Sequence, residues 1–342
     1  MKMEQQQQIA KSKEITFREA ITEALYEEME RDPRVFLMGE DLRVFFGGGP
    51  LGVTPSEKFL KRFGPERVRD TPISEASFIG AGVGAAITGM KPVVELMFVD
   101  FAGVCFDQMT NNAGKLRYIM GGQYNVPLVI RTTIGAGASF AAVHSQALYA
   151  LFAHSPGLKI VVPSTGADAK GLLKTAIRDK DPVIFFEHRG LYNVKGPVPS
   201  EEYTIPFGVA DVKRNGKDVT IVAIAAMVQK ALEAADILQK ENISAEVIDP
   251  RTLVPLDEKA ILDSVAKTSR LVVVDEDYER CGMASQISAA VASKGFGSLK
   301  APIKTVATPT VPIPYSKELE HSILPNAEKI SAAVREVVSY GS

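Results

Sequence analysis

Short runs of apolar residues that alternate with helix-like segments are the feature that most constrains the fold of this chain. These runs lack the polar–apolar alternation of a half-exposed strand, so each is expected to be buried on both faces. Such strands, separated by helices, are typical of a parallel sheet with helices on both sides. The sequence therefore predicts an α/β fold. In the first half of the chain the predicted strands are 35–38, 92–99, 126–132, 158–162 and 183–186.

The same alternation resumes after a stretch that contains several prolines. Pro197, Pro199 and Pro206 lie among polar residues, which is typical of a linker between domains. Because 342 residues are too many for one ordinary core, we expect two domains, the second of them smaller. The predicted order is a disordered polar tail at 1–14, a first α/β domain at 15–190, a linker at 191–210 and a second α/β domain at 211–342.

Composition weighs against several classes of function. The net charge is −2, whereas binding to nucleic acid depends on many lysine and arginine contacts. The two cysteines, Cys105 and Cys281, are far apart in the sequence and indicate neither a disulfide framework nor a zinc site. No apolar run approaches the roughly 20 residues that span a bilayer. We therefore expect a cytoplasmic protein that binds neither nucleic acid nor membrane.

A glycine pattern at 80–85 matches the dinucleotide-binding fingerprint G-x-G-x-x-A, and Asp100 follows about 20 residues later. That fingerprint requires a strand immediately before the glycines, whereas Pro72 and Ser74 indicate a turn and a helix start. Binding of a nicotinamide cofactor here is one alternative. The other is steric, because glycines four residues apart give a flat helix face that another backbone, such as a helix of a second subunit, can approach.

Glu75 begins a predicted helix at 75–88 that is rich in glycine and alanine. Two roles fit this residue. An acidic side chain in the first turn, after Ser74 as N-cap, stabilises a helix. The helix also has a buried composition, and a buried carboxylate must find a partner or become neutral. A ligand's protonated nitrogen would meet that need, so Glu75 is both a cap-region charge and a candidate site residue.

His144 follows a glycine-rich segment at 134–137, on a loop after a predicted strand. Ligands bind at the carboxyl ends of parallel strands, and imidazole exchanges protons near neutral pH. His144 is therefore a candidate proton donor, although a lone histidine in a loop is usually structural or solvated. We interpret His154 as a helix-end residue.

Phe98 and Phe101 lie at the end of the predicted strand 92–99. Core packing explains most aromatic side chains. The alternative role is stacking on a flat heterocycle, which suits Phe101 better because it lies beyond the strand end.

The end of the predicted helix 168–177 is a candidate cation site. Carbonyl groups left unpaired at a helix C-terminus can hold a cation together with nearby carboxylates. A plain polar helix end before a strand explains the same residues equally well.

Five motifs acquire meaning together: DTPISE at 70–75, GMKPVVE at 89–95, HSQ at 144–146, DAKGLL at 168–173 and IDPRTL at 248–253. Their combination resembles the beta chains of thiamine-diphosphate-dependent 2-oxo acid and acetoin dehydrogenases. The resemblance extends from about Thr16 to the C-terminus. It implies a thiamine pyrimidine-binding domain with a parallel sheet, followed by a smaller transketolase C-terminal-like α/β domain.

The resemblance also implies roles for single residues. Glu75 would bond to N1′ of the cofactor's aminopyrimidine and favour the imino form, whose nitrogen deprotonates thiazolium C2. Phe101 would stack on the pyrimidine. His144 would stabilise the intermediate or transfer a proton as the acyl group passes to a lipoyl arm. The family's potassium site would fall on Leu128, Ala176, Ile177, Asp179 and Asp181, with Asp181 in place of the asparagine of some relatives.

Thiamine enzymes hold the cofactor's diphosphate through Mg²⁺, with a Gly-Asp-Gly segment and a downstream asparagine. The sequence contains no such segment. The chain is therefore expected to supply half of a site. An alpha chain would supply the diphosphate half, in a heterotetramer of two alpha and two beta chains. A lipoyl-bearing dihydrolipoamide acyltransferase is the other expected partner.

The segment 95–108 is more similar to acetoin dehydrogenase beta chains than to pyruvate ones. The expected reaction is thus oxidative cleavage of acetoin, with decarboxylation of pyruvate or a branched-chain keto acid as alternatives within the family. Outside the family, the alternatives are a nicotinamide-dependent dehydrogenase and a non-catalytic scaffold that only docks partners.

Overall fold

The computed structural model describes residues 12–42 and 56–341, which divide into two compact units. Unit 1 comprises Met1–Ile134 and Leu151–Phe207, and unit 2 comprises Gly135–Ala150 and Gly208–Ser342. Residues 1–11 of the predicted tail lie outside the described residues.

The strands of unit 1 form the parallel sheet expected from the apolar runs. Their order is β6-β7-β5-β4-β2-β3, and each neighbouring pair is parallel. Every residue of β2, β5 and β7 is buried, which confirms strands covered on both faces. The strands are β2 (Val35–Glu40), β3 (Val68–Thr71), β4 (Lys91–Phe98), β5 (Val129–Ile134), β6 (Lys159–Val161) and β7 (Val183–His188).

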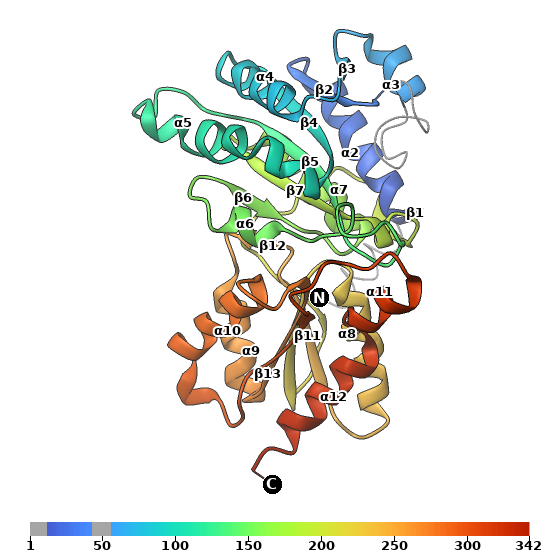
Figure 1. The fold of residues 1–342 in the computed structure, drawn as a ribbon, viewed down its shortest axis with the longest axis vertical. Coiled ribbons are helices and arrows are strands. Elements are labelled where there is room, and N and C mark those ends of the chain that lie inside the picture. Colours follow the sequence, from blue (N-terminus) through green and yellow to red (C-terminus); the bar gives the residue numbers. More distant parts are fainter. Residues whose placement is uncertain (1–11, 43–55, 342) are drawn as a thin grey trace. The chain divides into compact units, whose positions relative to one another are not determined.

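Helices cover both faces of this sheet. In Figure 1, α4 (Glu75–Ile87) and α5 (Gly114–Ile119) lie on one side, and α2 (Phe17–Arg31) and α7 (Gly166–Arg178) on the other. Helix α2 packs against α7. Helix α4 approaches β4 closely because of Gly82, where a Cβ atom would lie 2.7 Å from Val94 Cγ2.

Unit 2 contains a second, mostly parallel sheet in the order β14-β13-β10-β11-β9. Only β9 runs antiparallel to its neighbour among these described strands. Helices α8 and α12 share one hydrophobic core with the sheet, while α9 and α10 pack on its other face (Figure 1). The elements are β9 (Asp211–Arg214), β10 (Val219–Ala223), α8 (Met227–Gln239), β11 (Ala245–Asp249), α9 (Glu258–Thr268), β13 (Leu271–Tyr278), α10 (Met283–Lys294), β14 (Lys304–Thr308) and α12 (Ala327–Val338).

The predicted tail and the predicted linker both contain strands. Residues 12–14 lie in β1 (Ser12–Thr16), which pairs antiparallel with β8 (Lys195–Pro199). The tail prediction is therefore wrong for residues 12–14. Strand β1 is polar apart from Ile15, and β8 has one fully buried apolar side chain, that of Val198, so hydrophobic periodicity leaves little sign of either strand.

One helix of unit 1 is of mixed type. Residues 106–119 are helical without a break, and the middle of this helix, η3 (Gln108–Ala113), is a π-helix that leads into α5; the 3₁₀ turn η2 (Val99–Val104) precedes it. In η3 the hydrogen bonds span five residues, as from Gly114 N–H to the Met109 carbonyl. Helices α11 (Lys317–Ile323) and α12, which the sequence analysis did not predict, follow β14.

Within the described ranges, every helix is too short or too polar to cross a lipid bilayer.

Candidate active site

Glu75 is the first residue of α4, and its side chain is only 7% exposed. Ser74 occupies the N-cap position but does not cap the helix with its side chain. Its hydroxyl donates instead to the Pro72 carbonyl at 3.1 Å. The Ser74 side chain therefore leaves the N-terminus of α4 uncapped, and the positive end of the helix dipole favours a carboxylate at this place.

A second carboxylate, Glu40, interacts electrostatically with Glu75. Glu40 ends β2 opposite Thr71 of β3, and it is 3% exposed. Burial, and then the negative charges of Glu75 and Asp41, raise the pKa of Glu40 to about 7. Its Oε2 atom is buried and has no hydrogen-bond partner among the residues that the structure describes. An unsatisfied carboxyl oxygen with a perturbed pKa is typical of a functional site.

The sequence analysis did not identify Glu40 as a site residue. The available signal was its position at the carboxyl end of a predicted parallel strand, where ligands bind in α/β sheets. Its burial and its proximity to Glu75 depend on the packing of β2, β3 and α4, which periodicity alone does not give.

Cys105 interacts with Glu75 as a neutral thiol. Burial, and then the charge of Glu75, raise the pKa of Cys105 to about 12. The thiol is fully buried and lies 3.7 Å from the Ala102 carbonyl. Since the thiolate is the reactive form, Cys105 is a packing residue and not a nucleophile.

The two phenylalanines differ in their surroundings. Phe98 is 7% exposed, and the Arg189 guanidinium lies 5.3 Å from its ring centre. Phe101 lies in η2, which packs against α4, and its side chain is half-buried. The two rings meet edge to face with centres 5.6 Å apart. Phe98 thus belongs to the core, and Phe101 is the better candidate for stacking on a ligand.

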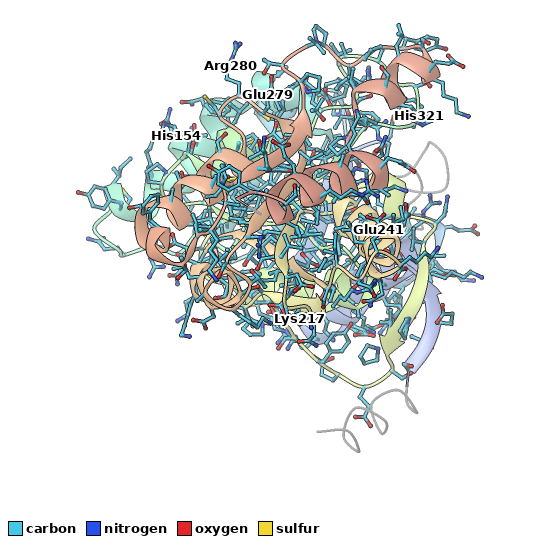
Figure 2. All side chains as sticks on the ribbon, turned by 90° about the horizontal axis from the view of Figure 1, so that it is seen from below. His154, Lys217, Glu241, Glu279, Arg280 and His321 are labelled. Atoms are coloured by element: carbon cyan, nitrogen blue, oxygen red, sulfur yellow. The ribbon has the colours of Figure 1, made fainter. Side chains whose placement is uncertain are left out.

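His144 belongs to unit 2, whereas Glu40, Glu75 and Phe101 belong to unit 1. Its side chain is half-buried, and its backbone N–H bonds to the Ala141 carbonyl at 3.5 Å. The structure therefore brings the Glu75 and Glu40 carboxylates together, while a joint role with His144 stays a prediction. His154 directly follows α6 (Tyr149–Ala153) and is exposed (Figure 2).

The glycine pattern at 80–85 lies wholly inside α4. A dinucleotide-binding turn requires these glycines between a strand and the start of a helix, so the nicotinamide alternative is not supported. A Cβ atom on Gly84 would meet no atom within 4 Å among the described residues. That face of α4 is open, and contact with a second subunit there stays a prediction.

The expected cation site lies where α7 ends, and its carboxylates already contact cationic side chains. Lys159 Nζ lies 2.7 Å from both carboxylate oxygens of Asp179 and 3.3 Å from Asp181 Oδ2. Burial would raise the pKa of Asp181, but hydrogen bonds from Arg117 and Lys159 outweigh it and keep the pKa below its usual value. The Ala176 carbonyl accepts the Asp179 N–H at 3.2 Å.

This donor set suits a hard cation with oxygen ligands only in part. Carbonyl oxygens retain a second lone pair for a cation, whereas the Lys159 ammonium competes for the two carboxylates. Among the described residues, no group of three or more His, Cys, Asp or Glu side chains is arranged to hold a metal ion. Any cation here would therefore depend on backbone carbonyl oxygens.

Comparisons with known proteins assign both units to families. Residues 13–195 match the family model of the transketolase pyrimidine-binding domain, and residues 208–330 match that of the transketolase C-terminal domain. The chain is 51% identical over 338 residues to the beta subunit of acetoin:2,6-dichlorophenolindophenol oxidoreductase of Cupriavidus necator, covering 96% of this chain and 99% of that subunit.

Two further proteins resemble the chain over nearly its whole length. Subunit beta-2 of the mitochondrial pyruvate dehydrogenase E1 component of Oryza sativa is 46% identical over 330 residues, covering 95% of this chain and 87% of that subunit. A solved structure described as a split gene transketolase, inactive beta4 tetramer, has a TM-score of 0.78 and 26% identity, covering 96% and 99% of the two chains. The chain belongs to the family of beta subunits of thiamine-dependent acetoin and 2-oxo acid dehydrogenases, built from transketolase pyrimidine-binding and C-terminal domains.

Proposed function

We propose that this chain is the beta subunit of an acetoin-cleaving oxidoreductase, and that it supplies the carboxylate that activates thiamine diphosphate. The buried Glu75 at the start of α4, next to the protonatable Glu40, carries this proposal. Residues 15–190 would act as the pyrimidine-binding domain and 211–342 as the C-terminal domain, joined at 191–210. The matches to the two transketolase families support these bounds.

The described residues fit an aminopyrimidine. When bound, thiamine diphosphate supplies a nucleophilic carbon and an electron sink. Glu75 would hold a proton shared with a ring nitrogen, because its burial penalises an isolated charge. Phe101 would place its ring against the pyrimidine. His144 would deliver or hold a proton at the oxygen of the transferred acyl group.

The partners follow from what the chain lacks and from the relatives' names. The sequence has no Gly-Asp-Gly segment for Mg²⁺ and diphosphate, so an alpha chain would hold both, in an assembly of two alpha and two beta chains. The relatives are named as beta subunits, and the similar structure is described as an inactive beta4 tetramer. A lipoyl-bearing dihydrolipoamide acyltransferase would accept the acyl group.

Acetoin is the proposed substrate because the acetoin-oxidoreductase relative is more similar to this chain than the pyruvate dehydrogenase relative, at 51% against 46% identity. The purified alpha–beta enzyme, assayed with 2,6-dichlorophenolindophenol as acceptor, should oxidise acetoin with a higher kcat/KM than pyruvate or 2-oxoisovalerate. A clear preference for either keto acid would contradict this assignment.

The decisive experiment replaces Glu75 in the reconstituted enzyme. Glu75→Gln keeps the size of the side chain but cannot share a proton with a ring nitrogen, so kcat should fall about 10²- to 10⁴-fold. Glu279→Gln, at an exposed glutamate (Figure 2), is the matched control. Wild-type kcat in Glu75→Gln would refute the proposed role.

A structural K⁺ is proposed at the end of α7, bound by backbone carbonyls of Leu128, Ala176 and Ile177 with Asp179 and Asp181 nearby. The C-terminal carbonyls of a helix favour a cation. The melting temperature should be higher in KCl than in choline chloride at equal ionic strength, and equal values would contradict the site.

A cytoplasmic location is also proposed. Both cysteines are free thiols, Cys105 buried and Cys281 exposed, as expected in a reducing compartment. Cell fractionation would test this.

A further inference from the structure

The segment that carries His144 begins with an unusual backbone. Gly135, Gly137, Ser139 and Ala141 all have positive φ, at 104°, 92°, 56° and 63°. Ser139 and Ala141 are not glycines, so the surrounding structure must hold them in this left-handed conformation. Left-handed residues that alternate with others direct successive backbone N–H groups toward one side, where they attract an anion.

Two buried carboxylates of unit 2 accept these N–H groups. Glu320 of α11 is fully buried, and its two oxygens accept from Gly137 N–H at 2.8 Å and from Ser139 N–H at 3.0 Å. Glu276 of β13 is 8% exposed and accepts from Ala136 N–H at 2.7 Å. Charge-assisted hydrogen bonds of this kind are stronger than neutral ones.

The far end of the segment is anchored to the same unit. The Tyr278 hydroxyl donates to Gln146 Oε1 at 3.2 Å, and the Tyr149 hydroxyl donates to Asp275 Oδ1. The segment also closes on itself, because Gly135 N–H bonds to the Gln146 carbonyl at 3.1 Å. His144 therefore lies on a loop that is fixed both before and after it.

A small apolar cluster supports the Glu320 side of this arrangement. Ala136 packs with Ile313 and Leu324, and Leu324 directly follows α11. A displacement of α11 would therefore move both the carboxylate and the packing surface of the loop.

From this geometry we propose that Glu320 is a positioning residue for the reaction. Its carboxylate binds the backbone of the loop through both oxygens and so fixes the place of His144. The inference rests on the proposed role of His144 in acyl transfer. It assigns to the C-terminal domain a task beyond assembly, namely holding a catalytic loop.

The test uses the reconstituted alpha–beta enzyme with three variants. Glu320→Gln keeps the shape of the side chain but presents one acceptor oxygen and one NH₂ group, so one loop N–H faces a donor. Glu320→Asp keeps the charge and both oxygens on a side chain shorter by one methylene. Glu318→Gln, on the exposed face of the same helix, is the matched control.

We expect Glu320→Gln to slow acyl transfer to free lipoamide about 10- to 100-fold, because small displacements of a catalytic group have effects of this size. The KM for acetoin and the Kd for thiamine diphosphate should stay within about threefold of wild type, since substrate and cofactor binding use other residues. Hydrogen exchange in the peptide containing Gly137 and Ser139 should accelerate. Glu320→Asp should recover part of the rate, and Glu318→Gln should behave as wild type.

His144→Ala, measured in parallel, separates the two ways of failing. If His144→Ala transfers acyl groups at the wild-type rate, the proposed role of His144 is wrong. If His144→Ala is slow but Glu320→Gln is as fast as Glu318→Gln, the role of His144 stands and the positioning inference fails. A parallel loss of cofactor affinity and rate in Glu320→Gln would likewise overturn it, because that result indicates general damage to the fold.

Discussion

Glu40 and Glu75 are interacting, buried carboxyl groups that lie in different surroundings. Both carboxyl groups are almost fully buried and repel each other, so keeping both ionised is unfavourable. Glu75 has the positive end of α4 next to it. Glu40 lies at the end of a strand, and its pKa rises to about 7. At neutral pH a large fraction of Glu40 therefore carries a proton, which lessens its repulsion of Glu75.

This raised pKa predicts a definite pH dependence of stability. The Glu40 carboxyl has a reference pKa of 4.5 and ionises near 7 in the folded chain. Between these values the folded state binds the additional proton, so the free energy of unfolding falls as pH rises through this window. Glu40→Gln removes the titration. The free energy of unfolding of Glu40→Gln, measured by urea denaturation relative to wild type, should therefore rise by about 1–2 kcal/mol when the pH is raised from 5 to 8.

The control for this measurement is Glu279→Gln, which changes an exposed carboxylate. Its stability relative to wild type should be the same at pH 5 and pH 8. The raised pKa of Glu40 is refuted if Glu40→Gln follows wild type in parallel over this range.

At the scale of elements, the central sheet of unit 1 contains a buried ionic network that its apolar runs do not reveal. Arg131 of β5 is 2% exposed. It donates to Glu187 of β7 at 2.6 and 3.1 Å and to Glu95 of β4 at 3.1 Å. Burial alone would lower the pKa of Arg131, but the charges of Glu187 and Glu95 outweigh burial and raise the pKa above its usual value. The three neighbouring strands are thus tied together by one guanidinium.

Removing that guanidinium should be costly. Arg131→Met leaves two buried carboxylates uncompensated, which should lower the free energy of unfolding by about 3–5 kcal/mol. Arg335→Met provides the contrast, because Arg335 donates to both carboxylate oxygens of an exposed glutamate, Glu241, which is labelled in Figure 2. That change should cost less than about 1 kcal/mol. Denaturant unfolding measures both losses. Equal losses in the free energy of unfolding for Arg131→Met and Arg335→Met would contradict the importance of the buried network.

Burial on both faces explains which strands could be predicted from the sequence. Strands such as β2, β5 and β7 were predictable because burial on both faces demands continuous apolar residues. Strands β1 and β8, which pair with each other, fully bury one apolar side chain, that of Val198, and so gave no periodic signal. Helix α12 was missed although its buried Ile330, Val334 and Val337 follow helical spacing.

The candidate site was predictable to a similar extent. Glu75 was accessible because it belongs to the motif at 70–75, and Phe101 because it lies just beyond the end of a predicted strand. Glu40 and Glu320 were not, since their importance arises from contacts with Glu75 and with the loop around Gly137. Those contacts join residues that are distant in sequence, and a single sequence contains no record of them.

At the scale of the whole molecule, the proposed site takes carboxylates and an aromatic ring from this chain, whose sequence has no Gly-Asp-Gly segment for a diphosphate. Such a surface would contact only the pyrimidine half of the cofactor. The stronger, charge-assisted contacts of thiamine diphosphate would form at its diphosphate and Mg²⁺. The open face of α4 around Gly84 fits the expectation that this surface is completed by another chain. Tight cofactor binding should therefore require the assembly and should not be a property of this chain alone.

Calorimetry tests this expectation directly. Thiamine diphosphate with Mg²⁺ should bind the isolated chain at least about 100-fold more weakly than the alpha–beta complex, a difference of about 2.7 kcal/mol. Glu75→Gln in the complex should retain Mg²⁺-dependent binding while losing activity, since the diphosphate half remains intact. Tight binding to the isolated chain would mean that a complete site lies within these residues, and the division of the cofactor between two chains would be wrong.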